Sequence, residues 1–257
     1  MTRILITGFE AFPGAPYNPT PKLVERLLRL RRPALADVTR IGHIFRVTYQ
    51  AVDRQLPELI AKHHPDALLM FGLATRTPFL RVETRARNTV TQIFPDASHA
   101  PVRSRTLELG AESTRRFGPH IAQLLRAARG TGIDARLSLS AGFYLCNYLS
   151  WRAIEATRRH DSDPKGRASA KWEPVFGENH AAKKGGPRLA AFIHVPLVPR
   201  DAAHHRKQGA VTFEQMVDAG EAVMMRMVGT VRQIHYSTNR SLALEVQDAP
   251  KHSVSIF

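Results

Sequence analysis

The sequence predicts a single-domain α/β protein: a three-layer α/β/α sandwich around a mixed, mostly parallel twisted sheet. The main observation is that short apolar runs alternate with longer amphipathic segments, which places helices on both faces of a sheet. The run 67–71 is apolar at every position, as is typical of a central strand buried on both faces. In addition, the 257 residues show no internal repeat and no interdomain linker, so we expect one domain over 1–257.

Turn residues and periodicity set the order of the first elements. Gly8 closes the first strand, and Pro21 stands in the first turn of a helix. The first half is predicted to contain strands at 3–7, 38–47 and 67–71, helices from about 20 to 30 and from 51 to 63, and an extended segment at 81–88.

The second half continues the alternation. Helices are predicted at 112–128, from about 144 onward and at 213–234, with strands at 135–140 and 189–195; residues 242–246 are a strand or a tail. A basic segment at about 158–188 is rich in Gly, Pro and Ser and is expected to be an insertion loop. A C-terminal extension is expected after about 235.

Composition limits the classes of function. The net charge of +15 would attract nucleic acid, but the basic residues are scattered and no aromatic-interleaved RNA-binding motif is present. No specific nucleic-acid partner is therefore expected. There is no apolar run long enough to span a membrane, no signal peptide and only one cysteine, so a cytoplasmic location is the simplest expectation.

No metal or other cofactor is expected. His63 and His64 are adjacent, but they fall at the end of a predicted helix and have no acidic or cysteine partner nearby. Positively charged or polar residues are common at a helix C-terminus. These histidines are therefore interpreted as helix-capping residues.

The segment 137–148 contains the only cysteine, Cys146. Residues 135–140 have a strand-like alternation, Gly142 interrupts it, and a helical pattern begins near Tyr144. Cys146 is thus expected in the first turn of a helix, where unpaired N–H groups and the helix dipole favour a thiolate. The alternative, a buried and inert thiol, is common among free cysteines.

Two other residues that could take part in chemistry lie at predicted strands. Glu83 is flanked by arginines, and an ion-paired surface carboxylate is the simplest interpretation from the residues alone. His194 stands near the end of the strand 189–195, where a lone histidine is usually a core or rim residue. All three residues follow or end candidate strands, which would gather them in a crevice at the carboxyl edge of the sheet.

Four segments of the sequence stand out together: ILITGFEAF at 4–12 with NPT at 18–20, ETRARN at 83–88, SAGFYLCN at 140–147 and FIHVP at 192–196. They resemble the pyroglutamyl-peptidase I family (pyrrolidone carboxyl peptidases), which are cysteine peptidases. The opening ILITGFEAF with NPT at 18–20 is similar to the family's LITGFEPFGG…NPT. ETRARN at 83–88 is similar to ERVAIN, SAGFYLCN at 140–147 to SxTAGxFVCN, and FIHVP at 192–196 is the family's FIHVP. The likeness extends from residue 1 to about 225, with the four segments in the family's order.

The resemblance implies a catalytic role for three residues. Cys146 would be the nucleophile, His194 the base and acid beside it, and Glu83 the carboxylate that orients the imidazole. Backbone N–H groups at the start of the cysteine helix would stabilise the oxyanion. The residues that would bind the substrate are Phe9, Phe12, Asn18, Leu73, Phe94, Tyr144 and Leu145.

Two positions depart from the family pattern. Leu73 replaces a glutamine of many members, and the family's ARIPD appears as QIFPD at 92–96, so that Ile93 replaces an arginine that helps to stabilise the oxyanion. Loss of an oxyanion donor can cost about 10²–10³ in rate. The candidates for compensation are Arg81, Arg85 and Arg87.

The sequence thus predicts an exopeptidase that removes N-terminal pyroglutamate through a Cys-His-Glu triad and a thioester. Its partner would be a peptide with a blocked N-terminus, and the resemblance implies a homo-oligomer, a dimer or a tetramer. Two alternatives stay open. One is a thiol amidase for another small N-acyl or lactam amide, suggested by Leu73 and Ile93; the other is a catalytically weak family member with a binding role.

Overall fold

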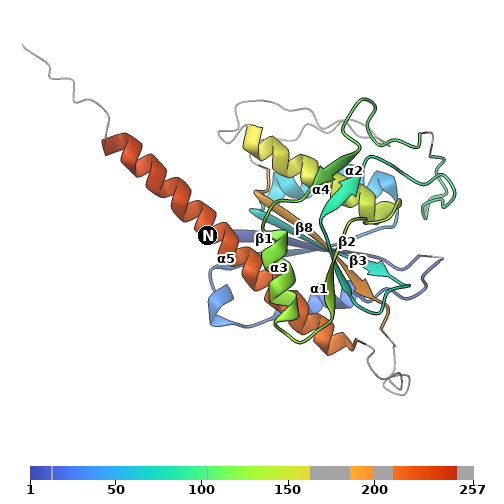
Figure 1. Cartoon of the computed structure of the whole chain (residues 1–257), viewed down its shortest axis with the longest axis horizontal. Coiled ribbons are helices and arrows are strands. Elements are labelled where there is room, and N and C mark those ends of the chain that lie inside the picture. Colours follow the sequence, from blue (N-terminus) through green and yellow to red (C-terminus); the bar gives the residue numbers. More distant parts are fainter. Residues whose placement is uncertain (13, 103, 163–185, 199–210, 248–257) are drawn as a thin grey trace, which may run out of the picture.

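The computed structural model describes residues 1–12, 14–102, 104–162, 186–198 and 211–247. Figure 1 shows a central twisted sheet flanked by helices. The strands are β1 (Thr2–Phe9), β2 (Val38–Phe45), β3 (Ala67–Ala74), β4 (Leu80–Glu83), β5 (Arg85–Arg87), β6 (Thr114–Arg116), β7 (Ala135–Ser138) and β8 (Leu189–Pro196). The helices are α1 (Thr20–Arg29), α2 (Tyr49–His63), α3 (Ile121–Arg129), α4 (Leu145–Ser162) and α5 (Phe213–Gln247), with a short 3₁₀ turn at Pro33–Leu35.

The main sheet has the strand order β2-β1-β3-β8-β4-β7 and is mixed. β2, β1, β3 and β8 pair in parallel, whereas β4 is antiparallel to β8 and parallel to β7. The predicted mixed, mostly parallel sheet is therefore confirmed. A separate ribbon is formed by β5 and β6, which pair antiparallel.

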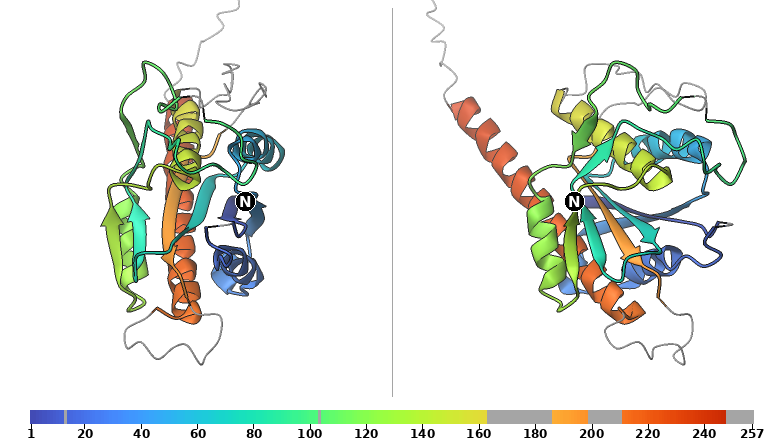
Figure 2. Two further views of the ribbon diagram at one scale, coloured as in Figure 1. Left: turned by 90° about the vertical axis from the view of Figure 1, so that its right-hand side faces the viewer. Right: turned by 45° about the vertical axis from the view of Figure 1, so that its right-hand side comes forward.

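Helices cover both faces of the sheet, as predicted. α1, α3 and α5 pack together on one face, while α2 and α4 pack on the other (Figure 2). The core lies between these layers, and β1, β3 and β8 are buried along nearly their whole length. Strands buried on both faces must be apolar throughout, which explains the continuous apolar run at 67–71.

Two predicted elements differ from the structure. The helix predicted at 112–128 begins only at Ile121, because Gly118 and Pro119 interrupt the segment and residues 114–116 pair with β5 instead. Residues 242–246, predicted as a strand or a tail, continue α5 as a helix. The end of α5 projects beyond the sheet (Figure 1).

The basic segment predicted as a loop at 158–188 begins as the last turns of α4, which runs to Ser162. Its centre, 163–185, lies outside the described residues. The histidines at the end of α2 behave as predicted: His64 adopts a left-handed conformation with φ of 46°, and its N–H donates to the Ile60 carbonyl.

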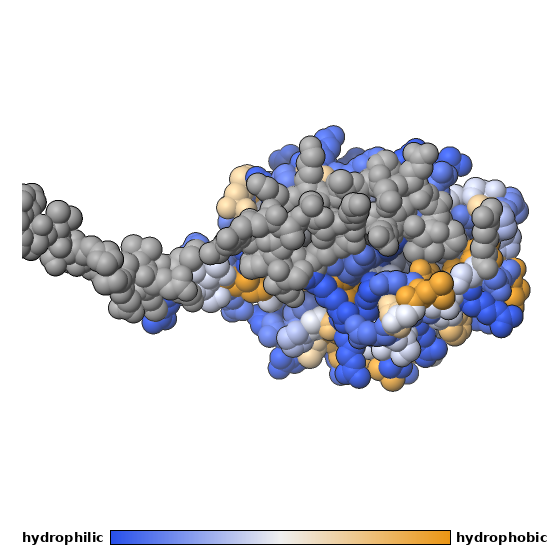
Figure 3. Space-filling model, turned by 90° about the horizontal axis from the view of Figure 1, so that it is seen from above, coloured by the Kyte–Doolittle hydropathy of each residue, from blue (hydrophilic) through white to orange (hydrophobic). Residues whose placement is uncertain are grey.

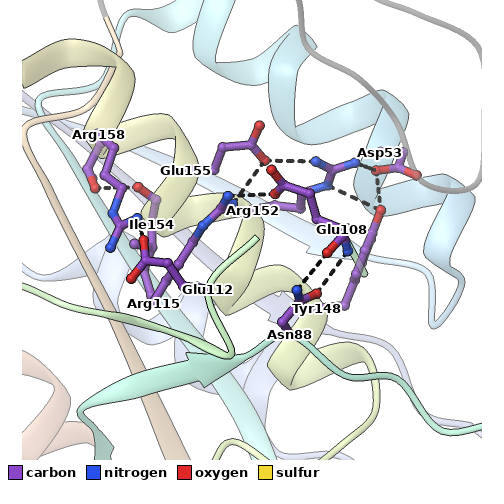
Figure 4. Close-up of polar contacts among 11 residues, drawn as sticks. Asp53, Asn88, Glu108, Glu112, Arg115, Tyr148, Arg152, Ile154, Glu155 and Arg158 are labelled. Carbon is purple, nitrogen blue, oxygen red and sulfur yellow. Dashed lines mark hydrogen bonds and ion pairs between the residues drawn. The ribbon is translucent and has the colours of Figure 1, made fainter. Parts of the chain in front are cut away.

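A buried polar network joins α4 to α2 (Figure 4). Arg152, only 3% exposed, donates to Asp53 at 3.2 Å and to Glu155 at 2.7 Å. The Tyr148 hydroxyl donates to Asp53, and burial raises the pKa of Tyr148, so that this group stays a donor. Because buried charges are costly unless paired, the network holds α4 in one position against α2. Cys146 lies on the same helix, one turn before this network.

Candidate active site

Glu83 and His194 meet across the antiparallel pair formed by β4 and β8. In that ladder Arg81 lies opposite His194, which puts Arg81, Glu83 and His194 on one face of the sheet. His194 Nδ1 lies 2.7 Å from Glu83 Oε1, and because a carboxylate only accepts hydrogen bonds, the imidazole N–H is the donor. The Glu83 side chain pairs with Arg81, as predicted, but it is fully buried, so its predicted place at the surface is wrong.

Phe9, Leu73 and His194 stand at or near the carboxyl ends of β1, β3 and β8, as expected for a crevice at that edge of the sheet, but Glu83 comes from an antiparallel strand. β4 and β7 run opposite to β8, so the carboxyl ends of these strands lie at opposite edges. Glu83 therefore contacts His194 as a diagonal neighbour across the β4–β8 ladder. The segment after β7 then leads to α4 and Cys146.

Cys146 lies in the first turn of α4, as the sequence predicts, and is partly exposed. Its thiol interacts with the His194 side chain, whose Nδ1 is already taken by Glu83. The thiol also packs against β3 at Gly72, which pairs with His194. A chain of contacts therefore runs from carboxylate to imidazole to thiol.

This arrangement favours a protonated imidazole. Burial lowers the pKa of His194, but its interactions with Cys146 and Glu83 outweigh burial and raise it to about 9. An imidazolium beside a thiolate is the ion pair from which a cysteine nucleophile acts.

A cavity of about 170 Å³ lies beside the thiol and the imidazole. Its wall is largely apolar and aromatic, and among the described residues that line it Cys146, His194 and Tyr144 alone have ionisable side chains. The lining residues are Phe9, Phe12, Asn18, Val47, Leu73, Ala141, Gly142, Phe143, Tyr144, Leu145, Cys146 and His194.

The structure brings most of the predicted substrate-binding residues to this cavity. Phe9, Phe12, Asn18, Leu73, Tyr144 and Leu145 all line it. Phe94 does not: its side chain is 66% exposed, and we leave it out of the proposed pocket. Its neighbour Ile93 is 82% exposed.

Two of the lining residues are held by specific contacts. The Asn18 side chain accepts from the Thr20 N–H at 3.0 Å and donates to the Glu10 carbonyl at 3.2 Å, which fixes the loop between β1 and α1. The Tyr144 hydroxyl donates to the Pro95 carbonyl at 2.9 Å. Burial, together with Asp96 and Cys146, raises the pKa of Tyr144 to about 12, so that it stays uncharged near neutral pH.

Ile93 is exposed and its side chain has no hydrogen-bond donor, so backbone N–H groups are the candidate oxyanion donors. The first N–H groups of α4, around Cys146, have no carbonyl partner within the helix. Arg81, one of the three candidates for compensation, donates to Ser138 and Ser140 instead and does not line the cavity. Arg85 donates to the Leu139 carbonyl, and Arg87 lies over the Phe143 ring.

Sequence reasoning missed several residues of the site. Val47, Ala141, Gly142 and Phe143 line the cavity, and Gly72 makes room for the thiol. Asn147 is fully buried and accepts from the Arg87 N–H at 2.8 Å, which fixes the segment after β5 against the start of α4. The signal for Asn147 and Phe143 was their place beside Cys146 in the motif.

No metal site is visible in the described part of the chain, where no three His, Cys, Asp or Glu side chains gather closely enough to hold an ion. The same residues include no helix that is both long and apolar enough to cross a membrane.

The family model for pyroglutamyl peptidase matches residues 2–167. The chain belongs to this family. It is 25% identical over 209 residues to a pyrrolidone-carboxylate peptidase of Pyrococcus furiosus, covering 81% of this chain and 88% of that one. It is 29% identical over 232 residues to the pyrrolidone-carboxylate peptidase of Vibrio vulnificus, covering 90% and 94%. The protein is therefore an enzyme, a cysteine peptidase.

Solved structures show the same fold. The pyrrolidone carboxyl peptidase from Thermococcus litoralis superposes with a TM-score of 0.71 at 23% identity, over 91% of this chain and 96% of that one. The pyroglutamyl peptidase I of Bacillus amyloliquefaciens superposes with a TM-score of 0.69 at 20% identity, over 89% and 98%. The predicted α/β fold and the resemblance to this family are both confirmed.

Gly72→Ala should lower kcat by about 10²-fold, because a misplacement of the thiol by roughly 1 Å is enough for such a loss. A Cβ at position 72 would lie 2.8 Å from Cys146 Sγ and 2.6 Å from Phe192 Cζ, so the thiol must move. The matched control is Gly229→Ala in α5, where a Cβ would meet nothing within 4 Å. Steady-state kinetics and the rate of Cys146 alkylation check the prediction, and equal values for both variants would contradict it.

Proposed function

We propose that this peptidase removes an N-terminal pyroglutamyl residue from peptides, using Cys146 as nucleophile, His194 as acid and base, and Glu83 as the orienting carboxylate. The observation that carries the proposal is the series of contacts from Glu83 through His194 to Cys146 beside a small, largely apolar cavity. The names of the relatives support the substrate: they are pyrrolidone-carboxylate peptidases.

In the proposed reaction the Cys146 thiolate attacks the carbonyl carbon of the pyroglutamyl amide and forms a tetrahedral intermediate. Backbone N–H groups at the start of α4 stabilise the oxyanion. The His194 imidazolium then gives its proton to the departing amine, the C–N bond breaks, and a thioester remains. Neutral His194 takes a proton from water, which hydrolyses the thioester, and the thiolate–imidazolium pair returns. Glu83 holds the imidazole in one tautomer throughout.

The cavity suits a small substrate group that carries no charge. Its aromatic walls fit a flat ring such as the five-membered lactam of pyroglutamate, while Asn18 and backbone groups supply the polar contacts. A peptide with a free, charged N-terminus would place that ammonium group in an apolar wall, at a large desolvation cost.

A panel of fluorogenic amides tests the choice of substrate. We expect release from pyroglutamyl-aminomethylcoumarin and at least tenfold lower kcat/KM for the prolyl, N-acetylalanyl and alanyl amides.

The second candidate function, a thiol amidase for another small N-acyl or lactam amide, is favoured by one observation: Leu73, at the family's glutamine position, lines the cavity. Cleavage of an acyl amide in preference to the pyroglutamyl one would support that candidate.

The activity should fall in alkaline solution as His194 loses its proton. The pKa of His194 is raised from its usual value of about 6.5 to about 9, so the imidazolium persists at neutral pH and is lost as pH rises through 9. The same shift stabilises the fold fully below about pH 6.5, and this stabilisation disappears between 6.5 and 9. A pH profile of kcat/KM should show its alkaline limb near 9; a limb near 7 would contradict the expectation.

Assembly, location and binding partners stay predictions. A homo-oligomer can be tested by light scattering of the full chain, and a cytoplasmic location by fractionation.

On the face in Figure 3, most of the described residues are hydrophilic, with small apolar areas between them. A binding role without catalysis would show itself as retention on DNA that weakens with salt in a protein whose thiol does not react.

A further inference from the structure

Arg81 contacts the same carboxylate oxygen as the candidate catalytic histidine. One of its guanidinium N–H groups lies 3.0 Å from Glu83 Oε1, the atom that accepts from His194 Nδ1 at 2.7 Å. The other oxygen, Glu83 Oε2, is buried and has no hydrogen-bond partner among the described residues. The direction of the carboxylate therefore depends on the two donors that share Oε1.

Arg81 also holds the segment that leads to the nucleophile. It donates to Ser138 Oγ from Nε at 3.2 Å and from a terminal N–H at 2.8 Å, and it donates to the Ser140 carbonyl. Ala141 and Gly142, the next residues, line the cavity. The planar guanidinium group of Arg81 presents several N–H donors in fixed directions and can bond several acceptors at once, which a lysine ammonium cannot do. One side chain thus joins the carboxylate on β4 to the loop between β7 and α4.

We propose that Arg81 is a positioning residue, which fixes Glu83 and the 138–142 segment so that His194 and Cys146 meet in the reactive geometry. This inference rests on the proposed function of Cys146, His194 and Glu83. Arg81 does not line the cavity, so it acts on the reacting groups and does not bind the substrate. It does not replace the oxyanion donor that is missing at Ile93.

The positive charge of Arg81 also affects how firmly His194 holds its proton. Within the described part of the chain, the ionisable groups that face His194 are Cys146 on α4 and Arg81 and Glu83 on β4, whereas β3 presents Gly72 there. With thiolate and imidazolium formed, the charges of these four groups cancel. Without Arg81 a negative charge is left over in a mostly buried site, which favours the protonated imidazole and holds its proton more firmly.

The test compares Arg81→Met and Arg81→Lys with the wild type. Arg81→Met should lower kcat by about 10²-fold with KM nearly unchanged, and should move the alkaline limb of the pH profile up by about one unit. Arg81→Lys keeps the positive charge, so its alkaline limb should lie at the wild-type pH. Its kcat should stay low, because a lysine ammonium lacks the planar set of N–H donors of the guanidinium group. The matched control is Arg136→Met on neighbouring β7, where the arginine pairs with exposed Asp134 and should leave activity unchanged.

A second readout needs no substrate. The rate at which iodoacetamide alkylates Cys146, followed against pH, reports the thiolate directly, and loss of the imidazolium proton appears as a step in that rate. The pH of this step should move upward in Arg81→Met and stay in place in Arg81→Lys. Wild-type kcat in Arg81→Met, a change in KM alone, or lower thermal stability with unmoved pH limits would overturn the inference. Failure of the proposed function looks different: the wild type itself would not release pyroglutamate, while the alkylation profiles would still test Arg81.

Discussion

Replacing Cys146 with alanine should lower kcat/KM for a pyroglutamyl amide by about 10⁴-fold or more and leave the fold intact. Removing a nucleophile takes away the acyl-enzyme pathway, and what remains is the small contribution of binding and oxyanion stabilisation. The change is small in volume, and the side chain is only partly buried, so thermal stability should change little. Steady-state kinetics and circular dichroism melting measure the two parts.

Chemical modification provides a control for this prediction. Because Cys146 is the only cysteine in the chain, iodoacetamide should add one label to the wild type and none to Cys146→Ala. Labelling should abolish activity in step with its extent. A Cys146→Ala protein that keeps wild-type turnover would rule out the mechanism, whatever its labelling shows.

Glu83→Gln should lower kcat by about 10³–10⁴-fold at neutral pH, the second-largest effect that we expect. A glutamine has nearly the same shape as glutamate, but its amide can donate to His194 and so favour the wrong tautomer of the imidazole. The variant also removes the negative charge that Arg81 contacts at 3.0 Å. Kinetics across the pH range should show that activity recovers little at any pH.

An exposed glutamate gives the matched comparison. Glu112 lies at the surface and pairs with Arg158, so Glu112→Gln should leave kcat unchanged. If Glu83→Gln kept more than about a tenth of wild-type kcat while remaining folded, the carboxylate would not have the orienting role that we assign to it.

The architecture followed from hydrophobic patterning, since strands buried by helices on both faces must be apolar along their length. Their continuous apolar runs made β3 and β8 recognisable. Helical periodicity placed the helix at Cys146 correctly. Segments whose structure depends on a distant partner were not recognisable. Residues 114–116 carry no strong pattern and form a strand only because β5 lies beside them.

The residues of the candidate site also fall into those that local sequence patterns predict and those that depend on distant partners. Local pattern was enough to put Cys146 at a helix start, but composition alone made Glu83 a surface ion pair, and only the family resemblance gave it a role. Its burial arises from the register in which β4 meets β8, and that register is a long-range property. The position of Arg81 depends on the same pairing, whereas that of Gly72 depends on the pairing of β3 with β8.

The ladder between β4 and β8 is short, pairing Arg81 with His194 and Val82 with Ile193. Short ladders open in local fluctuations that leave the rest of a domain folded. Amide protons of β4 should accordingly exchange with deuterium sooner than those of β1 or β3, at the centre of the sheet. On warming, the enzyme would lose turnover while most of its secondary structure persists, so that heat inactivation and global melting occur at separate temperatures.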